Sequence, residues 1–428
     1  MPPDDKSVDA GTWRVGKEPY ATSGECPLDS GADAGDIVTA AEPVVVAAPA
    51  ESATVVEPRP PPRVPPVVDV VDLGWDAIVA ALEPGALRAR MSATVEELET
   101  RLDEGGLRLL FDDQRTSSTD RALCVAEMSD EPLWFIGDLH GDLLALDAAF
   151  ALINREAARE SCAHPRIVLL GDLFDDGGYS LETVLRVFEA ILAHPESTCW
   201  IAGNHDEALG YDGARFTTTV APSHFSEFLN ADLTHEWIGR VGKLVIRMVA
   251  DAPRALFFPD GLLAAHGGFP LADLHARLAE TRDWNDPQCL TDFVWSRAHP
   301  RARKKLPNRA ARGSQFGYED FAAFCAVSAA VGRPVTHLVR GHDHVDERFE
   351  IYGAYAATPV LTTVALSRRL GREMFGPYAR VPTVARWIRG ALPQVHRLHI
   401  PESLVRVCYP EEAEEIVLPA SSAERGIT

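Results

Sequence analysis

The hydrophobic pattern of the chain is dominated by five short apolar runs, each of which ends in a turn of polar residues. They read LWFIGDLHGD at 133–142, IVLLGDLFDDGG at 167–178, TCWIAGNHDE at 198–207, LLAAHGG at 262–268 and THLVRGHDH at 336–344. Continuous apolar runs of this length are typical of buried strands. Each run therefore predicts a strand that leads into a turn containing Gly, which permits close backbone approach.

Amphipathic helices are predicted between the first three of these strands. Apolar residues recur at helical spacing near 143–154 and again near 180–194, as expected for helices that bury one face. This strand–helix alternation predicts a first sheet that is largely parallel. After residue 335, strands at 348–352 and 360–366 follow with few helices, which predicts a second, partly antiparallel sheet. The expected fold class is α/β.

The remaining segments carry weaker patterns. Further helices are expected at 271–281 and 318–331, where apolar residues have helical spacing. Strands are expected at 244–249 (LVIRMV), 255–258 (ALFF), 395–400 (VHRLHI) and 404–409 (LVRVCY), because these short runs are rich in β-branched and aromatic residues.

The pattern predicts four regions. Residues 1–70 contain twelve of the 31 prolines and are expected to form a disordered or polyproline arm. We interpret this arm mainly as a solvated tail, and docking of a partner is the alternative. Residues 71–125 form a helical preface, 126–380 the main domain that carries the five turns, and 381–428 a C-terminal extension and tail.

The net charge of −22 argues against nucleic acid or an anionic membrane surface as the main partner. The seven cysteines are scattered without a CxxC motif, which is typical of reduced thiols in a cytoplasmic protein. The first residues lack the basic and apolar pattern of a signal peptide. No apolar run approaches the ~18 residues of a membrane-spanning helix.

The five turns offer a mixture of ligands suited to first-row divalent metals, namely carboxylate and amide oxygens and imidazole nitrogens. Because open α/β sheets bind ligands where strands end, one site is expected to collect these side chains. Two cations ~3.5–4 Å apart would lower the pKa of a bound water and orient an in-line displacement. The candidate ligands are Asp138, His140, Asp172, Asn204, His266 and His342.

The ordered set GDLHG, GDLFDDGG, GNHD, HGG and RGH resembles the calcineurin-like metallophosphoesterases. Within them it is most similar to the phosphoprotein phosphatases that act on phosphoserine and phosphothreonine. Segments FVWSR at 293–297 and RGSQFGYEDFAAF at 312–324 extend the similarity, which covers roughly residues 130–370. The resemblance implies a two-sheet sandwich flanked by helices, with a dinuclear metal site at the C-terminal ends of the strands. It also implies hydrolysis of a phosphomonoester by a metal-bridging hydroxide.

The resemblance also implies roles for single residues. Asp138, His140 and Asp172 would hold the first metal, whereas Asp172, Asn204, His266 and His342 would hold the second. His205 would donate a proton to the leaving alkoxide, with Asp175 as its partner. Arg312 and Arg340 would bind the phosphate of the substrate. His344 matches a further ligand of the first metal in the broader superfamily, and a solvent-exposed loop histidine is the equal alternative.

The sequence departs from the family pattern in ways that bear on the substrate. Asp176 stands where the family has a phosphate-binding arginine, and ALSRRLGRE at 365–373 replaces a tyrosine-containing loop. Arg368, Arg369 or Arg372 is a candidate replacement for the lost arginine. The substrate expected is a phosphorylated protein. The alternatives are a small phosphoester or dinucleoside polyphosphate on the same metal site and, least favoured, a non-enzymatic scaffold. The ligand set fits Mn, Fe or Zn.

Overall fold

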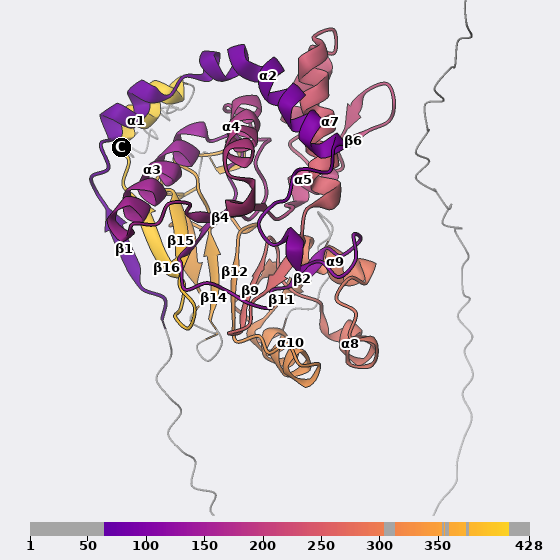
Figure 1. The fold of residues 1–428 in the computed structure, drawn as a ribbon. Helices are drawn as coiled ribbons and strands as arrows, with labels where there is room; N and C mark the ends of the chain where they lie inside the picture. The colour runs from indigo at the N-terminus through magenta and orange to yellow at the C-terminus, as the bar shows by residue number, and fades with distance from the viewer. Residues whose placement is uncertain (1–63, 304–312, 353–354, 356–358, 374–375, 411–428) are drawn as a thin grey trace, which may run out of the picture. The chain divides into compact units, whose positions relative to one another are not determined.

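The computed structural model describes residues 64–303, 313–352, 355, 359–373 and 376–410. Figure 1 shows how the helices and strands of this part are arranged. The predicted arm up to residue 63 and the tail from residue 411 lie outside the described residues. Among the helices of the described part, none is both long and apolar enough to cross a membrane.

The first sheet is built around the parallel strands that precede the first three turns. Its strand order pairs β3 with β4 and β4 with β5 in parallel, whereas β15 runs antiparallel to both β3 and β16. This confirms the largely parallel arrangement predicted for the first three turns. Across the sheet, the strands are β1 (Val67–Val70), β16 (Gln394–Leu398), β15 (Thr383–Trp387), β3 (Leu133–Ile136), β4 (Arg166–Leu169) and β5 (Thr198–Trp200).

The second sheet carries the last two turns. Strands β9 and β12 lie side by side in parallel, and β13 and β8 pair antiparallel with β14 and β9. The predicted partly antiparallel sheet is therefore confirmed. Its strands are, in order, β13 (Phe349–Ile351), β14 (Val360–Thr363), β12 (His337–Arg340), β9 (Leu262–Ala265), β8 (Ala255–Phe257) and β2 (Ala122–Cys124).

Helices connect and cover the two sheets. The short pairs β6 (Gly210–Tyr211) with β7 (Phe216–Thr217) and β10 (Arg297–Ala298) with β11 (Gln315–Phe316) lie in the connections. The helices are α1 (Trp75–Ala81), α2 (Pro84–Asp103), α3 (Leu143–Glu160), α4 (Ser180–Ala193), α5 (Asn204–Ala208), α6 (His224–Ala231), α7 (Glu236–Asp251), α8 (His275–Thr281), α9 (Pro287–Trp295), α10 (Tyr318–Ala330) and α11 (Glu402–Cys408).

Three apolar clusters show that the two sheets form the layers of a sandwich. Phe135 and Val168 of the first sheet pack with Val339 and Leu361 of the second in the space between the sheets. On its other face, the first sheet is covered by α3, α4 and α7, and α2 packs on α4 and α7. The outer face of the second sheet packs against α8, α9 and α10, which lie beside it in Figure 1. The predicted two-sheet sandwich flanked by helices is confirmed.

Two strands of the first sheet lie in segments that the sequence analysis assigned to the terminal regions. Val67–Val70, placed in the disordered arm by the sequence, forms β1 and pairs with β16. Thr383–Trp387, placed in a C-terminal extension, forms β15 and pairs directly with β3. Both strands belong to the first sheet because its edge beyond β3 would otherwise leave backbone donors and acceptors unpaired. The segment 71–125, predicted as a helical preface, contains α1, α2 and the strand β2.

Two predicted strands are helices. Residues 244–249 belong to α7, in which Val241, Leu244, Val245 and Met248 are buried. Residues 404–409 mostly belong to α11, in which Val405 and Cys408 are buried. Both buried sets follow the three- and four-residue spacing of a helix face, which the short apolar windows concealed.

Candidate metal centre

The five turns place their polar side chains in one region because the strands that precede them end at the same edge of the sandwich. The backbone there is unusual for residues with side chains. Asp138, His140, Asp172 and His342 all have positive φ, at 33°, 41°, 54° and 68°. Such conformations cost energy for residues other than Gly, and they concentrate at functional sites.

Two glycines allow the turns to approach one another closely. A Cβ on Gly203 would lie 2.2 Å from Oδ1 of Asp172, and one on Gly341 would lie 2.1 Å from Oδ1 of Asp138. Any larger residue would push the carboxylates away. The glycines beside the polar residues are therefore needed for this packing.

The first cluster consists of Asp138, His140 and His344, whose ligand atoms lie within 4.8 Å of one another. His140 Nδ1 lies 3.1 Å from the carbonyl oxygen of Phe174, and His344 Nδ1 lies 2.7 Å from Glu373. Both Nδ1 atoms therefore act as donors, so each Nε2 carries the lone pair. These two Nε2 atoms face each other at 3.2 Å. Facing lone pairs repel unless a cation lies between them, so the cluster fits a metal ion.

An unsatisfied carboxylate oxygen points to the same conclusion. Asp138 Oδ2 is buried and accepts no hydrogen bond within the described part of the chain. It lies 3.4 Å from Nε2 of His344. Buried carboxylate oxygens without partners are unfavourable, and a cation at this position would satisfy the oxygen.

The second cluster consists of Asp172, His266 and His342, again with ligand atoms within 4.8 Å of one another. His266 Nδ1 lies 2.8 Å from the carbonyl oxygen of Leu170, so its Nε2 faces the cluster. This Nε2 lies 3.0 Å from Oδ1 of Asn204 and 3.1 Å from Nδ1 of His342. A carboxylate, an amide oxygen and two imidazoles thus converge, as the sequence predicted.

The carboxylates around His266 stabilise a positive charge in this cluster. Burial alone would lower its pKa, but the charge of Asp172, assisted by Asp138, raises the pKa to about 9. A proton at Nε2 would therefore be held tightly. A metal ion competes for the same lone pair and the same carboxylates.

Asp172 lies between the two clusters. Its Oδ2 is 3.7 Å from Nε2 of His140 and 3.3 Å from Nε2 of His266. Burial favours its neutral form, yet the charges of His266 and His205 hold its pKa well below the usual range. Asp172 is thus a carboxylate that can contact both positions, as expected of a bridging ligand.

Asp206 joins the second and third turns through hydrogen bonds to their backbone. Its carboxylate accepts hydrogen bonds from the backbone N–H groups of Asp172, Gly203 and Leu173 and from the indole of Trp200, at 2.9–3.2 Å. It is fully buried, and burial together with the charge of Asp172 raises its pKa to about 6. Asp206 therefore positions the candidate ligands without facing the cluster.

His205 and Asp175 form a buried pair beside the first cluster. His205 Nδ1 lies 2.7 Å from Oδ2 of Asp175, and the His205 ring contacts the ring of His140 edge-on at 4.9 Å between centroids. Burial would lower the pKa of His205, but Asp172 and Asp175 outweigh it and raise the pKa. Asp175 is itself fixed by the N–H of Phe225 at 2.8 Å. The pair can hold a protonated imidazole next to the cluster.

Comparison with protein families agrees with this geometry. The model of the calcineurin-like phosphoesterases, described as Metallophos, matches residues 131–346, which include all five turns. The chain belongs to the calcineurin-like phosphoesterase family. The Asp and His clusters fit the metal dependence of this family.

The relatives of this phosphoesterase include protein phosphatases. The serine/threonine-protein phosphatase 6 catalytic subunit of Caenorhabditis elegans is 23% identical over 51% of this chain and 60% of the relative. Serine/threonine-protein phosphatase 5 of Homo sapiens is 23% identical over 52% of this chain and 40% of the relative. The chain thus covers less than two thirds of the length of either protein.

Solved structures were also matched, with TM-scores below 0.5. A protein serine/threonine phosphatase from Saccharomyces cerevisiae, with similarity to human phosphatase PP5, has a TM-score of 0.46 and 12% identity, covering 74% of this chain and 90% of that one. A metallophosphoesterase from Sphaerobacter thermophilus has a TM-score of 0.35 and 17% identity, and the match covers 68% of this chain and 96% of that one.

The predicted substrate-binding arginines of this phosphoesterase have different outcomes. Arg312 lies outside the described residues. Arg340 is completely buried, and all three of its nitrogens donate to protein acceptors, namely the carbonyls of Gly267 and Ser296, the hydroxyl of Thr362 and the carboxylate of Asp343. The guanidinium of Arg340 thus stabilises the last turn, and its binding of substrate stays a prediction.

Two residues that the sequence analysis did not identify hold the candidate metal centre in place. Glu373 is buried and bonds both to His344 and, through two nitrogens at 2.7 and 3.0 Å, to the buried Arg348. Asp142, at the end of the first turn, caps α3 with its side chain and accepts a hydrogen bond from the hydroxyl of Tyr409 at 2.9 Å. No local motif marks either contact, since the partners lie 25 or more positions apart.

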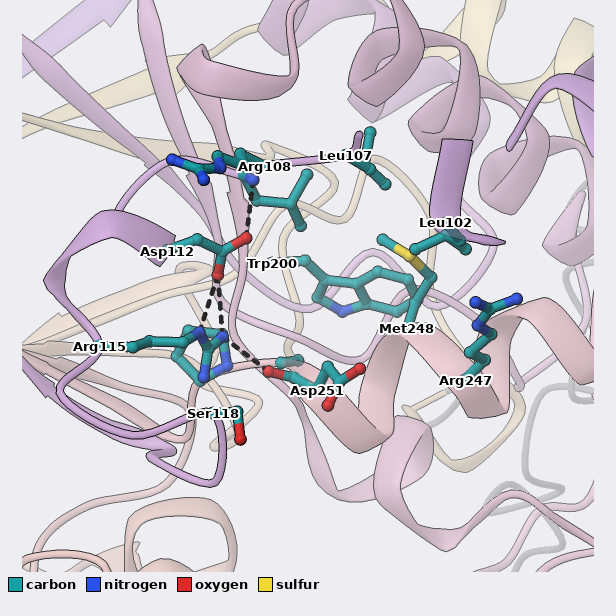
Figure 2. A pocket seen from close by; sticks show the side chains of 13 residues that line it. Leu102, Leu107, Arg108, Asp112, Arg115, Ser118, Trp200, Arg247, Met248 and Asp251 are labelled. Carbon is teal, nitrogen blue, oxygen red and sulfur yellow. Dashed lines mark hydrogen bonds and ion pairs between the residues drawn. The ribbon is translucent and has the colours of Figure 1, made fainter. Parts of the chain in front are cut away.

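A separate cavity of about 300 Å³ lies near the end of α2 and contains none of the predicted site residues. Figure 2 shows Trp200 in its wall, with Arg247 on one side and Arg115 on the other. Its link to the phosphoesterase site is indirect, through the bond from the Trp200 indole to Asp206 at 3.2 Å. The cavity is lined by Leu102, Leu107, Arg108, Leu109, Asp112, Arg115, Ser118, Trp200, Arg247, Met248, Asp251, Ala252 and Pro253.

Proposed function

We propose that this phosphoesterase is a dinuclear metal-dependent phosphatase that acts on phosphoserine and phosphothreonine in proteins. The observation that carries the proposal is the convergence of two ligand clusters on Asp172, beside the His205–Asp175 pair. Ligands of this kind suit Mn, Fe or Zn. The protein phosphatases among the relatives support the choice of substrate.

The ligands divide between two metal positions. Asp138, His140 and His344 would hold the first metal, and Asn204, His266 and His342 the second, while Asp172 would contact both. When bound, such a pair of ions makes hydroxide available near neutral pH and polarises the phosphoryl group.

The protein supplies the acid for the leaving group. With Nδ1 of His205 bonded to Asp175, the remaining proton of the imidazolium is at Nε2. Donation of that proton to the departing serine or threonine oxygen prevents an unstable alkoxide from forming. Because the carboxylate of Asp175 favours the protonated imidazole of His205, the acid is loaded over a wider pH range. Direct attack by water leaves no phosphorylated enzyme.

The walls of the site keep its electrostatic interactions strong. Asp138, His140, Asp172 and His266 are each 2% exposed or less. Removal of bulk water raises the strength of interactions between charges and dipoles. The neutral amide of Asn204 adds a ligand without adding negative charge, which limits repulsion of an anionic phosphate.

The experiment that tests this function is reconstitution with metals followed by a substrate comparison. Protein stripped by a chelator is reloaded separately with Mn²⁺, Fe²⁺, Zn²⁺ or Mg²⁺, and phosphate release is measured from phosphoserine and phosphothreonine peptides, p-nitrophenyl phosphate and diadenosine tetraphosphate. The expected result is metal-dependent release with the highest kcat/KM on phosphopeptides. A higher kcat/KM on diadenosine tetraphosphate would identify a dinucleoside polyphosphate hydrolase instead. Absence of release from every substrate with every metal would support a scaffold.

A further inference from the structure

A half-exposed arginine lies at the edge of the first ligand cluster. Arg372 belongs to the 3₁₀ turn Gly371–Glu373, and 43% of its side chain is exposed. Its NH2 group lies 3.3 Å from Oδ2 of Asp176 and 3.4 Å from Nε2 of His344. The guanidinium therefore lies at the solvent-exposed edge of the first ligand cluster.

The turn that carries Arg372 is anchored within the protein. The carboxylate of Glu373 accepts from the N–H of Leu370 at 3.0 Å, and the N–H of Glu373 donates to the carbonyl of Leu370 at 2.8 Å. Glu373 also pairs with Arg348 and His344. Arg372 is thus held next to the acid that orients His344, and its placement does not depend on a long free loop.

Other arginines that contact the turns are already used by the protein. Arg368 is 4% exposed and donates to the carbonyl oxygens of His140 and Asp176. Arg297 donates to the carbonyl oxygen of His342 and to Asp343. These guanidiniums have stable acceptors within the fold. Arg372, in contrast, is half-exposed, and the carboxylate of Asp176 beside it is one that an anionic ligand can displace.

Building on the proposed function, we propose that Arg372 binds the phosphoryl oxygens of the substrate and exchanges Asp176 for them. Asp176 Oδ2 is buried and meets no hydrogen-bond criterion in the described structure, so the ion pair at 3.3 Å is loose. A guanidinium bonds more favourably to two oxygens of a phosphate dianion in a fork. Asp176 thereby acts as an internal competitor that weakens the binding of phosphate, which is also the product.

The test uses the full-length, metal-loaded protein and inorganic phosphate as the probe. Three variants are compared with wild type: Arg372→Gln, Arg372→Lys and the control Arg159→Gln. Arg159 also carries a surface charge, is 62% exposed, and lies about 25 Å along α3 from the site. The Kd of phosphate is measured by calorimetric titration, kcat/KM on p-nitrophenyl phosphate by phosphate release, and metal content by elemental analysis.

Loss of one charge-assisted hydrogen-bond donor is expected to weaken phosphate binding about 10–100-fold in Arg372→Gln. Arg372→Lys restores part of this loss because it keeps the charge without the fork. Arg159→Gln changes the Kd less than about twofold. Unchanged phosphate binding in Arg372→Gln would overturn the proposal. Loss of metal from this variant would also overturn it, since Arg372 would then support the ligands instead of the substrate.

Asp176→Asn tests the exchange in the opposite direction. It is expected to tighten phosphate binding in the wild-type background more than in the Arg372→Gln background, because the competition acts through Arg372. Equal effects in both backgrounds would contradict the exchange. The titration also separates this proposal from the proposed function. If the metal-loaded wild type bound phosphate through Arg372 but hydrolysed no phosphomonoester, the function would fail and the assignment of Arg372 would stand.

Discussion

Replacement of Glu373 by Gln tests whether His344 is a metal ligand. Glu373 is 1% exposed and accepts hydrogen bonds from His344, Arg348 and the N–H of Leu370. Burial would raise its pKa, but the hydrogen bonds from His344 and Arg348 hold the pKa well below the usual range. At neutral pH it is a carboxylate. The substitution keeps the shape and removes the charge and one acceptor oxygen.

The structure gives two separate magnitudes for Glu373→Gln. The guanidinium of Arg348 is completely buried and would lose its paired charge, which costs about 3–5 kcal/mol of unfolding free energy. A domain whose stability exceeds this loss, as most of the ordinary range of about 5–15 kcal/mol does, would still fold. The second effect is on metal binding. An imidazole ligand that loses its orienting carboxylate typically binds metal 10–100-fold more weakly, which is about 1.4–2.7 kcal/mol.

The assay measures the two effects independently. Chemical denaturation of chelator-treated protein gives the unfolding free energy without any metal contribution. Titration of the same protein with Mn²⁺ against a competing chelator gives the metal affinity. Asp320→Asn is the matched control, because Asp320 is also a buried acid and accepts the N–H of Gly317 at 2.8 Å in the cap of α10, without contacting the candidate ligands.

We expect Glu373→Gln to lower both quantities and Asp320→Asn to lower stability alone. If Glu373→Gln lost stability while keeping the metal affinity of wild type, the reasoning would be refuted. Glu373 would then serve only the buried Arg348, and His344 would not be a ligand.

Three further predictions concern other groups. His205→Asn should retain wild-type metal content while kcat falls by about 10²–10⁴-fold; elemental analysis and steady-state rates check this, and an unchanged rate would exclude His205 as the proton donor. Asp172→Asn should remove metal and activity together, measured on the same samples, and a fully active variant would rule out the bridging position. Asp292 has a pKa raised from 3.8 to about 6 by burial, despite a hydrogen bond from the N–H of Leu271. Between pH 3.8 and about 6, Asp292 therefore stays protonated in the folded protein but is ionised in the unfolded chain. The unfolding free energy falls as the pH rises through this range, and the loss is complete above about pH 6. The unfolding free energy of Asp292→Asn should rise relative to that of wild type by up to about 3 kcal/mol as the pH increases from 4 to 7. Denaturation of both chelator-treated proteins at the two pH values measures this, and a difference independent of pH would contradict it.

The sequence predicts the centre of the molecule well because local pattern and global topology coincide there. Asp138 and His342 are 204 positions apart, yet the backbone N–H of His342 donates to Oδ1 of Asp138 at 2.9 Å. Their proximity follows from strands that end at one edge of the sandwich, which apolar runs and Gly-containing turns reveal.

The parts that the sequence analysis missed depend on tertiary contacts that leave no local signal. The link from Glu373 to His344 requires the loop after β14 to fold back onto the fifth turn. Similarly, Tyr409 reaches Asp142 only because α11 packs beside α3. Arg340 shows a different limit, since a guanidinium next to a ligand turn has the same sequence signature whether it faces the substrate or the core. Its bonds to Gly267, Ser296, Thr362 and Asp343 become visible only in the folded chain.

Anomalous X-ray diffraction from crystals grown with Mn²⁺ is the measurement that addresses the metal centre most directly. The account predicts two anomalous peaks about 3.5–4 Å apart. One should be coordinated by Asp138, His140 and His344 and the other by Asn204, His266 and His342, with Asp172 in contact with both. Peaks confined to other surfaces, or no peak within bonding distance of Asp172, would contradict it.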